Sequence, residues 1–201
     1  MPNWVYNNVR VYGEEKDVSK FMEKVEENKD NLFDSFLPMP KTYKDWDTAN
    51  HPNGKGLEVG KENIDILDEH KKFVVTEDYI NGLKKATKEQ REKYGVVGWY
   101  DWHCRYWGTK WDACDLEYDE RSFSFNTAWS APLPFMKYLA EQYPELGFLL
   151  TYADEDTHGG NCGAVIYHNG KVFEELDGSQ AFGVTMWNEW DTYYDEVTEE
   201  Y

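Results

Sequence analysis

The order of two hydrophobic patterns at the start of the chain most constrains how it folds. Residues 3–12 alternate between apolar and polar positions, as the side chains of a β-strand do. One face of this predicted strand consists of Val5, Asn7, Val9 and Val11. The segment that follows has apolar residues at helical spacing, namely Val18, Phe21, Met22 and Val25. A strand followed by an amphipathic helix requires a second strand to complete a β-α-β unit.

The sequence NLFDSFLPMP (31–40) is predicted to be that second strand, ended by its two prolines. Residues 41–98 differ in character and are interpreted as a large insertion, because their apolar content is too thin for a core of their own. The first part of the insertion is rich in turn formers and is expected to be irregular. Later in the insertion, Thr76 is placed to cap a helix that carries Tyr79, Ile80 and Leu83 inward.

The same order of patterns returns after residue 120. A strand over 121–127 precedes a helix over 132–144, whose inward positions are Met136, Leu139, Ala140 and Tyr143. A further strand, 146–153, follows. Asn169-Gly170 then predicts a two-residue hairpin turn between two extra strands. The prediction is an α+β chain of one ferredoxin-like domain, 1–201, with an antiparallel sheet and helices on one face.

Charge restricts the partners of the chain. It holds 39 acidic and 21 basic residues, a formal net charge of −18. A field of that sign repels phosphate backbones, so direct binding to DNA or RNA is disfavoured and a basic protein partner is favoured. Three widely spaced cysteines, no signal peptide and no apolar run of membrane-spanning length lead us to expect a cytoplasmic protein with free thiols.

Four stretches of the sequence point to one family. They are MPNW, FLPMP after the first helix, WYDWHCRYWGTKWDA and FNTAWSAPLP. Over residues 1–40 and 95–155 the chain resembles the DUF1281 (YubB or Api92-like) ferredoxin-like family of phages, prophages and plasmids. The resemblance implies a mobile-element gene and supplies no catalytic residues. Residues 41–98 and the acidic tail match nothing in the family pattern, and Val5 stands where relatives often have cysteine.

The tryptophan-rich stretch 99–113 is open to two interpretations. Large indoles can connect the insertion to the sheet, or they can line a pocket for a flat ligand such as a nucleobase. The candidate ligand-binding residues are Trp99, Trp102, Arg105, Trp107, Lys110 and Trp111. Because His103 and Cys104 are adjacent, a strand here would point their side chains to opposite faces.

The segment from Asp177 onward, 177–201, contains no Lys or Arg. Its stripe of Met186, Trp190, Tyr193 and Val197 fits a helix over the free face of the sheet, or an acidic, aromatic arm for a partner. The candidate partner-binding residues are Glu189, Asp191, Asp195 and Glu196.

Enzymatic chemistry has one weak candidate. If Met1 is removed, Pro2 presents a secondary amine that could act as a general base, with Arg10 or Arg105 holding an enolate, as in tautomerases that use an N-terminal proline. The acidic loop of Asp154, Glu155, Asp156 and His158 lacks EF-hand spacing and is expected to be an exposed hairpin tip. No metal site or cofactor is expected.

Two hypotheses of function follow from the sequence. The first is a non-enzymatic accessory protein of a mobile element that binds a basic host or phage protein, in one variant by imitating DNA phosphates to sequester a nucleic-acid-binding host factor. The second is a binder of a small ligand or nucleotide, or a proline-dependent tautomerase.

Overall fold

The structure, a computed structural model, describes residues 2–40, 43, 51–64, 72–156 and 160–187. The chain divides into two compact units: a sheet unit, Met1–Pro38 with Tyr106–Tyr201, and an inserted unit, Met39–Arg105. The insertion predicted over 41–98 falls inside the second unit. Both strand–helix patterns therefore lie in one unit, as a shared sheet requires.

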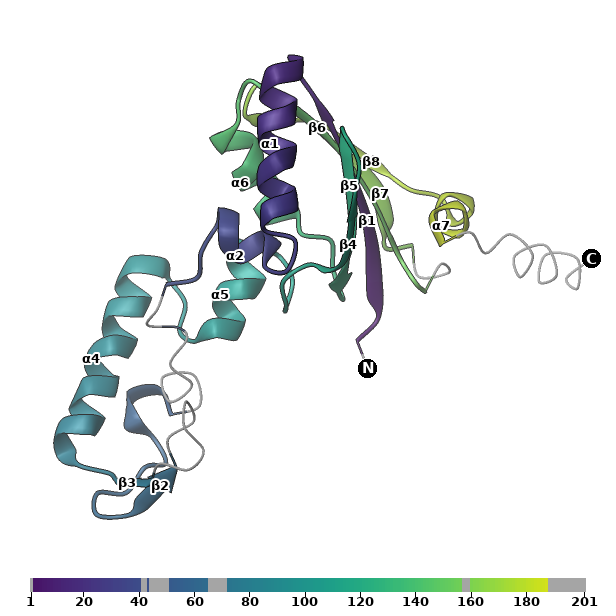
Figure 1. Ribbon diagram of the computed structural model, residues 1–201. Coiled ribbons are helices and arrows are strands. Elements are labelled where there is room, and N and C mark those ends of the chain that lie inside the picture. Colours follow the sequence, from purple (N-terminus) through teal and green to yellow (C-terminus); the bar gives the residue numbers. More distant parts are fainter. Residues whose placement is uncertain (1, 41–42, 44–50, 65–71, 157–159, 188–201) are drawn as a thin grey trace, which may run out of the picture. The chain divides into compact units, whose positions relative to one another are not determined.

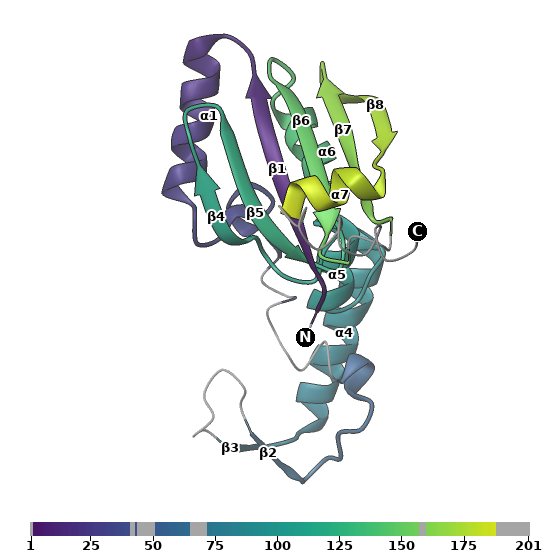
Figure 2. The ribbon, with the colours of Figure 1, turned by 90° about the vertical axis from the view of Figure 1, so that its right-hand side faces the viewer.

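The sheet unit contains a six-stranded sheet in the order β4-β5-β1-β6-β7-β8, antiparallel throughout (Figure 2). Its strands are β1 (Trp4–Tyr12), β4 (Cys114–Tyr118), β5 (Ser122–Ala128), β6 (Gly147–Asp154), β7 (Cys162–His168) and β8 (Lys171–Asp177). Helix α1 (Glu15–Glu27) follows β1, and α6 (Leu133–Gln142) connects β5 to β6. These two helices and the strands β4-β5-β1-β6 form a ferredoxin-like β-α-β-β-α-β arrangement, as predicted. The β7–β8 hairpin adds the extra edge.

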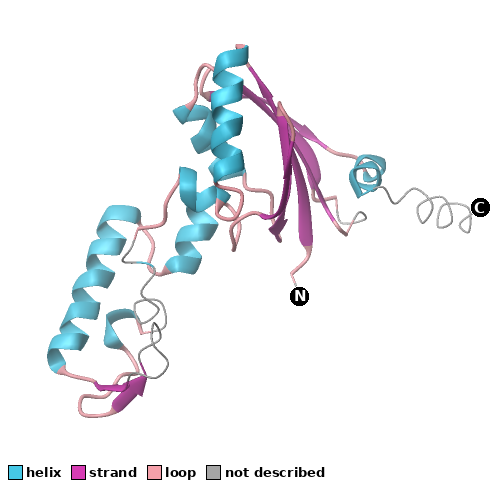
Figure 3. Cartoon of the chain, viewed as in Figure 1, coloured by secondary structure: helices cyan, strands magenta, loops and turns pink. Residues whose placement is uncertain are grey.

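Helices α1 and α6 lie on the same face of the sheet (Figures 1 and 3). The four positions of α1 predicted to point inward are all buried. Helix α6 begins after Pro132 and buries Phe135, Met136, Leu139 and Ala140, while Tyr143 follows its last turn. The alternating face of β1 is also buried, with both Val5 and Val9 fully covered. Local hydrophobic periodicity therefore located these elements correctly.

A phenylalanine core fills the space between the helices and the sheet. It consists of Phe21, Phe33, Phe36, Phe123, Phe125, Phe135 and Phe148, all buried. The rings of Phe33 and Phe135 have centroids 4.2 Å apart, and Phe21 meets Phe148 edge-on at 5.4 Å. Edge-on and tilted contacts of this kind are favourable between aromatic quadrupoles, so these rings contribute beyond the area they bury.

The strand predicted over 31–40 is wrong. Residues Leu32–Phe36 form helix α2, which buries Leu32, Phe33 and Phe36. The backbone N–H groups of Phe33 and Asp34 donate to the Asp112 carboxylate at 2.7 and 3.0 Å. An acceptor at the start of a helix satisfies N–H groups that have no partner within it. This acceptor is 79 residues away from Phe33 in the sequence, so no local pattern could indicate it.

The second strand of the first half is β4, which follows the insertion. It pairs with β5 at the edge of the sheet, and its register shifts between Cys114 and Glu117. Asp115, within this irregularity, has a positive φ of 54°. The strand is mostly exposed, and it therefore lacks the apolar alternation that identifies a half-buried strand.

The inserted unit contains the short 3-10 helix η2 (Pro52–Gly54), strands β2 (Glu62–Ile64) and β3 (Lys72–Val74), and helices α4 (Glu77–Tyr94) and α5 (Trp99–Tyr106). The predicted cap is confirmed, because Thr76 Oγ1 accepts a hydrogen bond from the N–H of Tyr79 at 3.1 Å. The buried phenol of Tyr43 donates to the carbonyl of Val96 at 2.8 Å. This contact joins the beginning of the unit to the segment after α4.

Helix α7 (Gln180–Trp187) lies on the face of the sheet opposite α1 and α6 (Figures 1 and 2). The indole nitrogen of Trp187 donates to the carbonyl of Ala153 at 3.0 Å, and its ring lies 6.0 Å from that of Tyr6. The start of the C-terminal segment thus packs on the free face, as one interpretation predicted. The other predicted stripe residues, Trp190, Tyr193 and Val197, lie outside the described residues.

Candidate functional site

The six predicted ligand-binding residues are divided between the two units. Trp99, Trp102 and Arg105 belong to the inserted unit, whereas Trp107, Lys110 and Trp111 belong to the sheet unit. Each group therefore has surroundings within its own unit.

In the inserted unit, these residues lie on helix α5 rather than on a strand. His103 and Cys104 therefore do not alternate between two faces as a strand would place them: His103 is buried and Cys104 is exposed on the helix. Trp102 is 2% exposed and packs near Tyr43, with ring centroids 6.4 Å apart. The surroundings of Trp102 are those of a core residue.

In the sheet unit, Trp107 also supports the fold. It is buried, and its indole nitrogen donates to the carbonyl of Leu37 at 3.0 Å. Its ring meets Phe33 edge-on at 5.8 Å. Trp107 therefore extends the phenylalanine core toward the end of α2.

Lys110 and Trp111 have different surroundings, and they meet two tryptophans that the sequence analysis did not select. The ammonium of Lys110 lies 4.5 Å from the ring centroid of Trp111 and 5.3 Å from that of Trp129. The rings of Trp4 and Trp111 are 6.2 Å apart. We call Trp4, Lys110, Trp111 and Trp129 the indole–lysine cluster. Trp111 is 37% exposed and Trp129 is 48% exposed, so much of the indole surface is open to solvent.

Buried polar side chains hold the two loops of the indole–lysine cluster together. Thr109 Oγ1 donates to the carbonyl of Ala128 at 3.0 Å, and Ser130 Oγ donates to the carbonyl of Gly108 at 2.6 Å. Thr127 Oγ1 donates to the carbonyl of Ser130 at 2.8 Å and accepts from the amide nitrogen of Asn7 at 2.9 Å. Buried hydrogen bonds fix one geometry because any group left unpaired is costly.

Two backbone positions in these loops are also constrained. Gly108 has a φ of 84°, and a Cβ there would lie 2.4 Å from Pro134 Cδ, so only glycine fits. Trp129 has a φ of 67°, which is unusual for a bulky residue. Its N–H donates to the carbonyl of Asn3 at 2.9 Å. Strain of this kind persists where the surrounding structure enforces it, and it is concentrated at functional sites.

Asp112 follows the cluster in sequence but is turned inward to α2. Burial raises the pKa of its carboxyl group above the ordinary value, although hydrogen bonds from the N–H groups of Phe33, Asp34 and Ala113 oppose that rise. Its role in the structure is to accept these hydrogen bonds rather than to present a charge at the surface.

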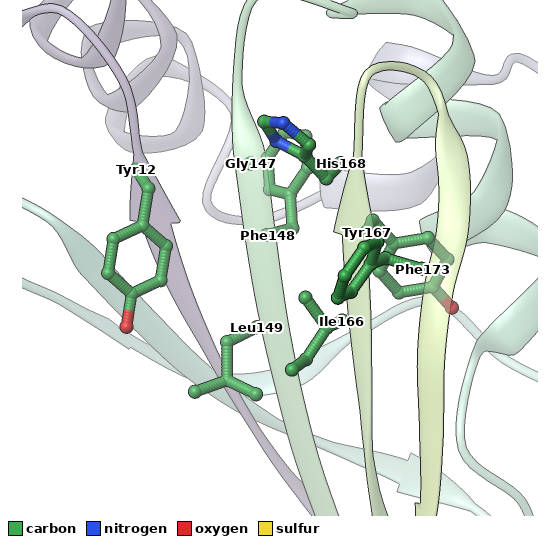
Figure 4. Close-up of a pocket in the computed structure, with 8 residues that line it drawn as sticks. All are labelled: Tyr12, Gly147, Phe148, Leu149, Ile166, Tyr167, His168 and Phe173. Atoms are coloured by element: carbon green, nitrogen blue, oxygen red, sulfur yellow. The ribbon is translucent and has the colours of Figure 1, made fainter.

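A second candidate surface lies at the opposite edge of the sheet. Strand β8 is exposed at all seven positions, including Val172, Phe173 and Leu176. The register with β7 shifts at Phe173, which stands between two paired residues and is 72% exposed. Beside it, an apolar pocket of about 320 Å³ is lined by Tyr12, Gly147, Phe148, Leu149, Ile166, Tyr167, His168 and Phe173 (Figure 4). Glu174, Glu175 and Asp177 add negative charge to this edge.

The other residues that the sequence analysis selected, for partner binding, catalysis or metal binding, are not brought together into a site in the described residues. Glu189, Asp191, Asp195 and Glu196 lie outside the described residues, as does His158. Pro2 is half-buried, and Arg10 is separated from it by most of strand β1, roughly 26 Å at the rise of an extended strand. Arg105 belongs to the other unit. In the described residues, no group of three or more His, Cys, Asp or Glu side chains is arranged to hold a metal ion.

The acidic loop after β6 is not simply an exposed tip. Asp154 is buried, and its carboxylate accepts hydrogen bonds from the amide nitrogen of Asn161 at 3.0 Å and from the N–H of Asp156 at 2.9 Å. Glu155 accepts from the N–H of Trp4 at 3.0 Å. These two carboxylates hold the loop and the start of β1 in place.

The sequence did carry a signal for Trp129. It stands between Ala128 and Ser130, where β5 has ended and a turn leads to α6. Turns favour small and polar residues, so a tryptophan in one conflicts with local turn chemistry. Such local conflicts are expected at functional sites.

A comparison with known protein families supports the resemblance over the second half of the chain. Residues 106–196 match the family model described as the ferredoxin-like domain in Api92-like protein. Over this segment the chain is similar to Api92-like proteins. The match continues to residue 196 and so includes most of the acidic tail, which the motif comparison had left outside the family.

One solved structure resembles the chain: the crystal structure of protein Api92 from Yersinia pseudotuberculosis. The two sequences are 10% identical, the TM-score is 0.45, and the alignment covers 89% of this chain and 99% of Api92. No protein with a curated description matches the chain. Among the described helices, none has the length and apolar character needed to cross a membrane.

Proposed function

We propose that this Api92-like chain is a non-enzymatic binding module that takes up an extended, basic segment of a partner protein at strand β8. The proposal depends mainly on one observation: β8, an edge strand, is exposed at all seven of its positions. An exposed edge strand offers backbone donors and acceptors to another chain, and natural proteins usually protect such edges.

The chemistry of this edge supports one kind of occupant. In strand addition, backbone hydrogen bonds provide affinity, and pockets for alternate side chains provide specificity. Phe173 and the adjoining apolar pocket fit an apolar side chain of the added strand. Glu174, Glu175 and Asp177 are exposed carboxylates on the same strand, and the whole chain has a net charge of −18. Lysine or arginine side chains in the added strand complement them.

The family setting extends the proposal. The resemblance of the sequence motifs to proteins of phages, prophages and plasmids supports a role as an accessory protein of a mobile element in the cytoplasm of a host cell. There it acts on a basic or nucleic-acid-binding host or phage protein. The chain's own acidic charge disfavours direct binding to nucleic acid.

The test uses a labelled nine-residue peptide that alternates lysine with valine, and a second peptide with glutamate in place of lysine. Fluorescence anisotropy of the full chain is expected to show binding of the lysine peptide alone, and binding that weakens as salt rises. The double variant E174K/E175K is expected to lose this binding.

A matched control makes the same charge change elsewhere. The variant E23K/E27K alters two exposed carboxylates of α1 and is expected to retain most of the affinity. Equal losses in both double variants would show that only overall charge matters and would remove β8 from the proposal. If the wild-type chain binds neither peptide, the proposed function itself fails. Once the peptide result is positive, mass spectrometry of co-purifying host proteins identifies the natural partner.

A further inference from the structure

The indole–lysine cluster is a second surface, separate from β8, and the proposal above gives it no role. Trp4, Lys110, Trp111 and Trp129 come from three separate segments of the chain. The pairing of β1 with β5 sets Trp4 opposite Ala128, directly before Trp129. The hydrogen bonds of Thr109, Thr127 and Ser130 then lock the loops. A site whose side chains are held by a second layer of buried hydrogen bonds is preorganised for a ligand.

We infer that this cluster binds a small planar aromatic anion of the nucleoside monophosphate class. Exposed indole faces stack on flat rings, and every nucleobase has a π-face that stacks on an aromatic side chain. Lys110 places a positive charge within 5.3 Å of the ring centroids of both Trp111 and Trp129. A molecule that carries a ring and an adjacent anionic group contacts the indoles and Lys110 at the same time.

The electrostatics of the chain favour a small anion over a polymer. A long nucleic acid would bring many phosphates into the field of a chain with net charge −18. A single phosphate meets mainly nearby charges, because salt screens beyond about 8 Å at physiological ionic strength. Among the described residues, Asp112 adjoins the cluster in sequence and Glu155 adjoins it at Trp4. Both already accept backbone hydrogen bonds.

The test is isothermal titration calorimetry, which measures the affinity of the full chain for adenosine 5′-monophosphate, adenosine and inorganic phosphate. The monophosphate is expected to bind more tightly than either of its parts. W129A is expected to weaken its binding about 5- to 150-fold, the range measured for loss of one stacked aromatic ring. K110Q is expected to weaken it about tenfold, the size of a charge-assisted hydrogen bond.

Two control variants are expected to bind like the wild type. K137Q removes an exposed lysine of α6, and Y100A removes an exposed ring of the inserted unit. Circular dichroism verifies that each variant folds. Since Trp129 and Lys110 are surface side chains, K110Q alone still tests the site if W129A does not fold.

Four outcomes overturn the assignment. Unchanged affinity in both W129A and K110Q removes the cluster as the binding site. A loss in only one variant, or equal affinity for inorganic phosphate and the monophosphate, contradicts joint recognition of ring and anion. Tighter binding of a single-stranded oligodeoxythymidine than of the monophosphate replaces the small ligand by a nucleic acid strand.

Discussion

The phenylalanine core and the indole–lysine cluster both contain aromatic side chains of the sheet unit, but the rings have different surroundings. In the core, Phe33 contacts other rings on several sides and is fully buried. In the cluster, Trp129 is 48% exposed, contacts a lysine ammonium and has a strained backbone. A ring surrounded by other rings stabilises the fold. A ring held outward at a cost in backbone energy is better explained by binding.

The largest expected effect concerns the core. Phe33→Ala removes a buried ring that lies 4.2 Å from Phe135 and 5.5 Å from Phe125. The free energy of unfolding, measured by urea denaturation, is expected to fall by about 3–5 kcal/mol. A loss below about 1 kcal/mol would mean that these rings do not form a close-packed core. The phenylalanine core and the indole–lysine cluster would then not differ in their contribution to stability.

The next effect concerns the hydrogen bonds beneath the cluster. Thr127→Val keeps the side-chain shape but removes the hydroxyl that joins Asn7 to the carbonyl of Ser130. Buried groups left unpaired are expected to lower the free energy of unfolding by about 1–3 kcal/mol. Binding of the monophosphate is expected to weaken as well, because the loop that carries Trp129 is no longer fixed.

Thr151→Val is the matched control for this variant. Thr151 is half-buried on β6, and its hydroxyl makes only a 3.4 Å hydrogen bond to the carbonyl of Asn8. We expect little change in stability and none in binding. Comparable losses in the two variants would show that any threonine hydroxyl in this sheet has the same effect, and the network would have no special role.

A smaller effect is expected from Asp112, which joins α2 to the stretch that carries the cluster. Burial raises the pKa of its carboxyl group in the folded chain. The folded state therefore holds the proton more tightly than the unfolded state, and the stability that this provides is lost as pH rises above the ordinary carboxyl pKa. The unfolding free energy of the wild type relative to Asp112→Asn is expected to fall with rising pH in that range.

Asp119 provides a control of opposite sign at the turn between β4 and β5. A hydrogen bond from the Ser122 hydroxyl, with further ones from the backbone, lowers the pKa of its carboxyl group. The stability of the wild type relative to Asp119→Asn is therefore expected to rise with pH through the acid range. The same sign in both comparisons would contradict the burial of Asp112.

Local sequence patterns were sufficient to predict most of the helices and strands. They failed where contacts between distant parts of the sequence determine the structure. The alternation of β1 and the helical spacing of α1 and α6 identified these elements, because each buries one continuous face. Helix α2 was mistaken for a strand, since its cap is supplied by Asp112 from beyond the insertion. Strand β4 was missed because an exposed, irregular edge strand has no apolar alternation to detect.

The residues of the candidate site also divide into those that the local sequence pattern identified and those that it missed. Lys110 and Trp111 were selected because they lie in one dense stretch of sequence. Trp4 and Trp129 join them only through the pairing of β1 with β5, which connects positions more than a hundred residues apart. Trp102 and Trp107 came from the same stretch and are core residues, since composition alone does not distinguish a buried indole from an exposed one.

The surface indoles are proposed to serve binding rather than stability. The most direct measurement is the free energy of unfolding of Trp129→Gly together with its affinity for adenosine 5′-monophosphate. Glycine relieves the positive φ, so stability is expected to stay within about 1 kcal/mol of the wild type while binding is lost. Trp107→Ala, which removes the buried indole of the same stretch, is expected to cost about 3–5 kcal/mol. A loss of several kcal/mol in Trp129→Gly with unchanged affinity would contradict the claim.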